Sequence, residues 1–381
     1  MSELIKSEKN ETRFRWQLLA TVSAVTLLGY TAQAEARNDE PQVWIELGAQ
    51  LTRLDIAQEN FDPAIMSNRP AMFTPSTDYQ ELPHQSVDGT GKLTFRPDGS
   101  NWTFSAGVRY GRSVRHVDVN QQTFPVPFDA TFYFMGHKTS LGYHAPLAAR
   151  FAGTQIKSSE SHFLLDFQAG KDVGMGLFGG KSHIDVGVRF AQFSNKTNIT
   201  LNSDPDWHMT FKYTTVPFLG LYHFKVWNGE GYHSYSANLQ AERSFRGIGP
   251  SLSWNGSSPF LGGNEDGGLA IDYGANVAVL FGRQRATVAH QTTGISHAPV
   301  RYAPRLQTTT LSTVHPRSRS VVVPNVGAFA GVTYRIHDFK ISAGYRADFF
   351  FNAMDGGNDA RRTEKIGNYG PFATVSFGLG G

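Results

Sequence analysis

The sequence contains no cysteine, little charge and no run of apolar residues long enough for several helical membrane spans. Of its 381 residues, 18% are charged, and the net charge is +3. The lack of cysteine excludes a disulfide scaffold, a cysteine zinc site and thiol catalysis. The small net charge gives no indication of nucleic-acid binding. The mean hydropathy of −0.32 excludes a polytopic helical membrane protein, because each span needs about 20 mostly apolar residues.

Glycine and aromatic residues are abundant instead. The chain has 39 glycines and 28 phenylalanines, and 13% of its residues are aromatic. This aromatic content supplies more surface for burial than disordered segments have. Together with moderate polarity, it is typical of many strands that have one polar and one apolar face.

The amino-terminal segment has the order of a secretory signal. Basic residues precede a 15-residue apolar run, Trp16–Tyr30, and the small-residue motif Ala32-Gln33-Ala34 follows. This order predicts a cleaved signal peptide at 1–34 and a single mature domain at 35–381. The alternative is a membrane anchor, which the run disfavours because it is shorter than the roughly 20 residues of a span.

Apolar and polar residues alternate repeatedly in the mature chain. Between Phe339 and Phe349, one face is apolar or aromatic throughout, whereas the other carries Lys340, Arg346 and Asp348 among small residues. Period two over about 9 to 11 residues is the pattern of a tilted membrane strand. The same alternation begins at Val43, Trp102, Phe163, Ile184, Leu269 and Ala373.

These strands predict an all-β protein, and two architectures alternate in this way. A soluble sandwich is the competing interpretation. Lumen-like faces rich in glycine, aromatics near the ends of the apolar faces, and connections that alternate between short and long all favour the membrane. We therefore predict a transmembrane antiparallel up-and-down β-barrel with short periplasmic turns and long extracellular loops.

The number of strands depends on residues 235–254. A turn at Ser244-Phe245-Arg246 gives 12 strands, whereas one long strand that protrudes from the membrane gives 10. The apolar phase shifts from Leu239 to Leu252, on either side of Ser244. The shift favours 12 strands slightly, although a bulge also shifts the phase.

Several motifs resemble the Legionella major outer membrane protein type of pore-forming proteins. They are Ser244–Leu252, Asp272–Gly282, Gly344–Phe351 and Tyr369–Phe377, in this order along the chain. The resemblance implies an outer-membrane barrel that lets small solutes through, without defined catalytic residues. Outer-membrane strands usually end on an aromatic residue that the barrel-assembly machinery reads, whereas Gly378-Leu379-Gly380-Gly381 follows Phe377 here.

The inward positions of the predicted strands supply the candidate functional residues. Charged side chains facing lipid would cost roughly 2 to 4 kcal/mol for Arg or Lys at the midplane, which places them inside. The candidates for pore-lining residues are Glu46, Arg109, Asp166, Asp185, Arg189, Asp272, Arg335, Lys340, Arg346 and Asp348. Five are basic and five acidic, which predicts a narrow pore with little charge selectivity. The alternative is that they pair with one another and fill the lumen.

No motif predicts an enzyme, a cofactor or a metal site. The segment Gly174–Gly179 matches G-x-G-x-x-G, but it lies between two predicted strands and lacks the helix that binds a dinucleotide. The segments Asp355–Asp359 and Asn264–Gly267 are similar to calcium loops, but turns select the same residues. The 13 histidines form no H-E-x-x-H motif or close pair, and no G-x-S-x-G elbow occurs.

The sequence therefore predicts a porin-like protein in the outer membrane of a Gram-negative bacterium. Its expected function is passive diffusion of small hydrophilic solutes and ions through the lumen. The alternative is a plugged barrel with a structural or adhesin-like role, for which aromatic residues of the long loops are the motive. The expected partners are outer-membrane lipid, the assembly machinery and the solutes, and the sequence leaves open whether the chain forms a homo-oligomer.

Overall fold

The computed structural model describes most of the chain after residue 42. The described residues are 43–55, 84–123, 128–134, 137–143, 150–174, 176, 180–204, 232–263, 267–298 and 305–379. The predicted signal peptide lies outside them. None of these residues forms a helix with the length and apolar character needed to cross a membrane.

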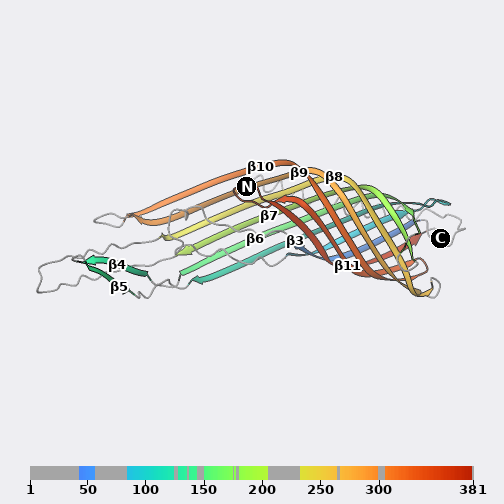
Figure 1. Ribbon diagram of the computed structural model, residues 1–381, viewed down its shortest axis with the longest axis horizontal. Helices are drawn as coiled ribbons and strands as arrows, with labels where there is room; N and C mark the ends of the chain where they lie inside the picture. Colours follow the sequence, from blue (N-terminus) through green and yellow to red (C-terminus); the bar gives the residue numbers. More distant parts are fainter. Residues whose placement is uncertain are drawn as a thin grey trace, which may run out of the picture.

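Ten antiparallel strands close into a barrel, and two further strands form a separate hairpin (Figure 1). The barrel strands are β1 (Val43–Asp55), β2 (His84–Phe95), β3 (Trp102–Thr123), β6 (Arg150–Asp172), β7 (Lys181–Asp204), β8 (Tyr232–Gly263), β9 (Gly267–Ala298), β10 (Arg305–Ile336), β11 (Phe339–Asp355) and β12 (Thr363–Leu379). The hairpin pairs β4 (Phe128–Phe134) with β5 (His137–Tyr143). The described residues thus form 12 strands, ten of which belong to the barrel. The barrel closes because β1 pairs with both β12 and β2.

The preference for a 12-stranded barrel was wrong, and the alternative of ten is correct. β8 runs without a turn through Ser244 and pairs with β7 continuously from Tyr235 to Ser257. Its odd-numbered residues face the interior on both sides of Ser244, since Leu239 and Ser253 are buried whereas Gln240 and Leu252 are exposed. The apolar phase shifts because the apolar residues change sides of one strand.

This change of side divides the barrel into two zones. In the first zone, the apolar zone or membrane zone, the outer face is apolar and exposed, as at Ile248, Leu252 and Phe281. In the second zone the outer face is polar, and the interior holds the buried cluster that includes Ile199, Leu201, Leu239 and Val288. The outer face of the first zone fits a lipid environment, and that of the second zone fits water. In this arrangement the apolar side chains of both zones avoid water.

The second zone is built by only part of the wall. Strands β8, β9 and β10 each have 32 residues, whereas β11 and β12 have 17. Figure 1 shows these long strands continuing from the barrel toward the left of the view. Many residues predicted as extracellular loop are therefore strand, including the outer parts of β3, β6, β7, β9 and β10.

β11 bends into the barrel near its end. Its register with β12 breaks between Phe350 and Met354, and Asn352 has a φ of 63°. After this bulge Ala353, Met354 and Asp355 are buried. The connection between β11 and β12 is therefore short and spans 356–362. We call residues 352–362 the inward segment.

Candidate functional site

A polar network crosses the interior of the membrane zone. Arg109 of β3 donates to Asp348 of β11 over 2.5 Å and to Gln50 of β1 over 3.2 Å. On the shorter way around the barrel, β2, β1 and β12 separate β3 from β11. The ion pair therefore joins almost opposite walls. Asp348 and Gln50 are fully or nearly fully buried.

Arg189 of β7 holds the other half of this network. Its guanidinium pairs with Asp166 of β6 at 2.6 Å and donates to Asn276 of β9 at 2.7 Å and to Asn325 of β10. Asn276 in turn donates to Asp348 over 3.4 Å. The network thus continues from β6 to β1 through side chains alone.

The remaining candidates lie in the same interior but form separate contacts. Lys340 pairs with Asp272 at 2.9 Å. Asp185 accepts hydrogen bonds from Asn255 at 2.7 Å and Ser253 at 3.3 Å. Glu46 accepts a hydrogen bond from the Ser376 hydroxyl. The guanidinium of Arg335 lies over the Trp44 ring, and that of Arg346 lies over the rings of Phe329 and Phe372.

Glycine makes room for the network at one point of the wall. A Cβ atom at Gly327 would collide with Asp348 Oδ1 and with the Asn276 amide. Gly327 lies opposite both residues in the β-sheet register. Its lack of a side chain therefore lets Asp348 turn toward Arg109, a positional requirement that the charge pattern alone did not reveal.

A second polar cluster lies around Asp88 on β2. Its carboxylate accepts hydrogen bonds from Thr52 at 2.5 Å and Ser86 at 2.7 Å, and His162 Nε2 lies 2.9 Å away. Asp88 and His162 are buried. Sequence reasoning missed this pair, because Asp88 lies on a strand whose apolar alternation is interrupted by Gly89 and Gly91.

An apolar layer fills the interior next to the polar network. Phe193 of β7 contacts Phe350 of β11, with ring centroids 4.7 Å apart. The strands β8, β9 and β10 separate β7 from β11, so this contact also joins nearly opposite walls. The buried cluster around the two rings contains Leu164, Ala191, Phe245, Ala278, Leu280, Val321, Val323, Ala353, Met354 and Ile366.

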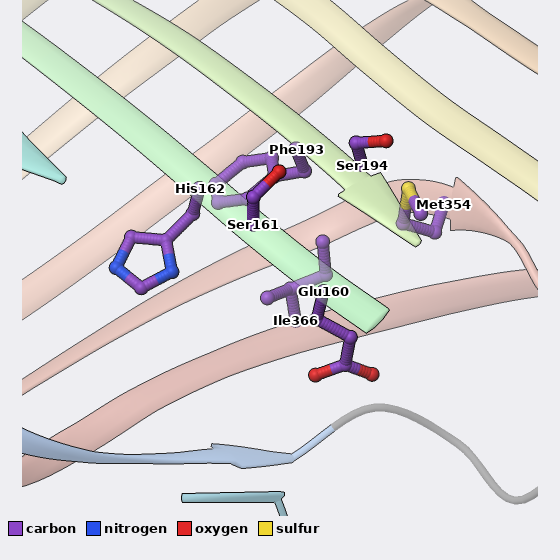
Figure 2. A pocket seen from close by; sticks show the side chains of 7 residues that line it. All are labelled: Glu160, Ser161, His162, Phe193, Ser194, Met354 and Ile366. Carbon is purple, nitrogen blue, oxygen red and sulfur yellow. The ribbon is translucent and has the colours of Figure 1, made fainter. Parts of the chain in front are cut away.

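Packing in this layer leaves a small hollow beside Phe193. Figure 2 shows Phe193, Met354 and Ile366, which reach it from different strands, and His162 with its ring turned away from them. The complete lining is Glu160, Ser161, His162, Phe193, Ser194, Met354 and Ile366. The interior at this level is therefore mostly occupied by side chains.

The inward segment is fixed to the long strands by hydrogen bonds. Arg317 of β10 pairs with Asp355 at 2.9 Å and donates to the carbonyls of Gly357 and Asn358. Arg243 of β8 donates to the Asn358 side chain at 3.0 Å. Burial lowers the pKa of Arg243 to about 10, an effect that Asp355 opposes and Arg317 reinforces.

Sequence reasoning missed the residues that close the interior. Phe193 and Phe350 lie on inward positions that were expected to be polar, and Asp355–Asp359 was interpreted as a turn. Asp355 does accept hydrogen bonds from the backbone N–H groups of Gly357 and Arg362, as a turn residue does. The continued period-two alternation through β8, with apolar residues on its inward side, was the available signal.

Comparison with known families identifies the chain. Residues 100–379 match the family model of the Legionella pneumophila major outer membrane protein precursor. The chain belongs to this family. The match confirms the resemblance seen in the motifs and covers β3 through β12. Family membership and the barrel together place the protein in the outer membrane of a Gram-negative bacterium.

No curated protein sequence gives a significant match to this chain. Solved structures show only distant similarity. The translocator domain of the autotransporter NalP from Neisseria meningitidis is 11% identical, with 97% of each chain covered and a TM-score of 0.25. A TodX deltaS2S3 mutant monoaromatic hydrocarbon channel is 9% identical, with 91% of each chain covered and a TM-score of 0.22. Similarity this low carries no argument about function.

Proposed function

We propose that this family member is a porin-like pore for passive diffusion of small hydrophilic solutes and ions. The observation that carries the proposal is the charged inner wall of the membrane zone, which lies behind an apolar outer wall. Water and ions meet favourable partners along such a wall, whereas an apolar lumen would exclude them. Membership of an outer-membrane protein family supports the same function.

The proposed pore is narrow and opens by movement of the inward segment. Arg109–Asp348 and Phe193–Phe350 each bridge distant strands, so both layers restrict the passage. The inward segment carries Met354 into the apolar layer. The bulge and the positive φ at Asn352 supply a place where the segment turns away from the barrel wall.

The proposed pore has little charge selectivity. Of the ten charged candidates on the inner wall, Arg109, Arg189 and Lys340 pair with carboxylates at 2.5 to 2.9 Å. Paired charges present a weak net field to a passing ion. We therefore expect similar permeability to small cations and anions.

Single-channel recording in planar bilayers tests this function. We expect the folded protein to give small discrete conductance steps. The double change Arg109→Met with Asp348→Leu removes the polar bridge and is expected to alter the step size. Glu242→Gln, on the exposed outer face of β8, is the matched control and should leave it unchanged. The absence of steps from folded protein would refute the proposal.

A plugged barrel with a surface-interaction role is the second candidate. The observation that favours it is the contact between Phe193 and Phe350 across the interior, together with the extension of β8–β10 beyond the apolar zone. The loop aromatics that motivate this role, Phe61, Tyr79, Trp207 and Trp227, lie outside the described residues. This candidate predicts that shortening a loop abolishes surface binding without changing solute permeability.

A further inference from the structure

Two histidines and an aspartate converge on the inner face of the long strands. His290 lies on β9 and His315 on β10, two residues beyond Thr313, the register partner of His290. Asp359 belongs to the inward segment. Its Oδ1 atom lies 2.8 Å from His290 Nε2 and 3.4 Å from His315 Nε2. The three donor atoms all lie within 4.8 Å of one another.

These separations fit the ligand shell of a small metal ion. A tetrahedral centre with bonds of about 2.0 to 2.1 Å holds its donor atoms roughly 3.3 Å apart. The contact of Asp359 with His315, at 3.4 Å, matches this spacing, and the contact with His290, at 2.8 Å, is somewhat shorter. Two imidazoles and one carboxylate are a ligand set suited to zinc and neighbouring divalent transition metals. Three protein ligands leave a fourth position for water.

The hydrogen bonding of His290 points to the same kind of ligand. Its Nε2 lies 2.6 Å from Thr313 Oγ1 as well as 2.8 Å from Asp359 Oδ1. If Nε2 carries a hydrogen, this one hydrogen has to serve both oxygens. If it carries none, Nε2 can accept from the Thr313 hydroxyl but faces the Asp359 carboxylate without a hydrogen between them. A metal ion bound between Nε2 and Oδ1 avoids both situations. The Thr313 hydroxyl is then placed to donate to a metal-bound water or to complete the shell.

The cluster is reachable and its electrostatic surroundings tolerate a cation. The side chain of Asp359 is 71% exposed and that of His315 36%, whereas His290 is 7% exposed. An ion can therefore enter from the solvent side and reach a buried ligand. The nearby guanidinium of Arg317 is compensated by Asp355 at 2.9 Å and by carbonyl oxygens of the inward segment.

We infer that His290, His315 and Asp359 form a binding site for a divalent transition-metal ion of the zinc type. The ligands come from β9, β10 and the inward segment, so the bound ion ties this segment to the long strands. Metal binding thereby stabilises the arrangement in which Phe350 and Met354 fill the interior. Its effect on conduction rests on the proposed pore function, whereas the site itself does not.

Calorimetric titration of the full-length, metal-free protein in detergent with zinc chloride tests the site. We expect saturable binding of one ion per chain. His290→Ala, His315→Ala and Asp359→Asn should each weaken binding by about tenfold or more, the range seen even for residues that only support metal ligands. Asp359 is exposed, so its variant should fold even if the histidine variants do not.

His116→Ala is the matched control. His116 Nε2 lies 3.1 Å from Asp118 in an exposed pair on β3, and its loss should leave zinc affinity unchanged. The inference is overturned if wild-type protein binds no zinc, or if Asp359→Asn binds it as tightly as wild type does.

A second readout separates the metal site from the pore. Zinc should slow hydrogen exchange in residues 356–362 of wild-type protein and lower its single-channel conductance, and Asp359→Asn should abolish both effects. Unchanged hydrogen exchange at saturating zinc contradicts the tie between the ion and the inward segment. If zinc slows hydrogen exchange in a protein that never conducts, the metal site is supported and only the proposed pore function is rejected.

Discussion

At the scale of single residues, buried charge is held by pairing across the barrel. Asp348 is 1% exposed and depends on Arg109, whose guanidinium reaches it from a distant strand. Charge on inward positions could be predicted from alternation, because an unpaired charge in lipid is costly. The partners could not be predicted, because side-chain contacts across a lumen depend on strand number and stagger.

Removing one member of this pair should be costly. We expect Arg109→Ala to lower the free energy of unfolding by about 3 to 5 kcal/mol, because it leaves a buried carboxylate without its main counter-charge. Lys196→Ala, which breaks the exposed pair with Glu242 on the outer wall, should cost about 0 to 1 kcal/mol. Urea unfolding in detergent, followed by circular dichroism, measures both. Equal losses would contradict the buried bridge.

The backbone at Asn352 makes a second residue-scale prediction. A φ of 63° is tolerated by asparagine and glycine but strained for β-branched residues. We expect Asn352→Val to destabilise the inward segment by about 1 to 3 kcal/mol and to speed cleavage within 356–362 by an added protease. Asn352→Gly, which keeps the backbone conformation accessible, should be cleaved much more slowly than Asn352→Val. Cleavage that is equally slow in both variants and in wild type would argue against this turn.

At the scale of strands, the surrounding medium determines on which side of a strand the apolar residues lie: outward in lipid and inward in water. The apolar face of β8 lies outward at Ile248 and Leu252 and inward at Leu239 and Ala241. A single strand that passes from lipid into water must exchange its faces in this way. The sequence shows this shift, but a turn and one long strand that protrudes from the membrane were both compatible with it, and the turn was wrongly preferred.

The lack of native cysteine allows the single-strand assignment to be tested directly. A bulky, membrane-impermeant maleimide added to intact cells should label Gln240→Cys, which lies on the exposed outer face of β8. Ile248→Cys, on the same face within the apolar zone, should remain unlabelled until detergent is added. Protection of Gln240→Cys would restore the alternative in which the chain turns near Ser244.

At the scale of the whole molecule, the side chains inside the barrel restrict its lumen more than the number of strands does. Period-two alternation was sufficient to predict an all-β membrane barrel, and motif order indicated its family. Alternation indicates which apolar residues face inward, but their contacts were beyond reach, because Phe193, Phe350 and Met354 meet only after the barrel closes and β11 bulges. Local sequence patterns contain no signal for such distant contacts.

The most direct test of this account is the single-channel conductance of Phe350→Ala compared with Phe351→Ala. Phe350 is buried in the apolar layer, whereas the neighbouring Phe351 faces outward and is 43% exposed. Both variants lose the same volume, so circular dichroism must first show that each is folded, since Phe350→Ala is expected to cost about 3 to 5 kcal/mol. We predict a larger conductance step for Phe350→Ala and a wild-type step for Phe351→Ala. Identical steps from both folded variants would contradict the claim that the apolar layer constricts the pore.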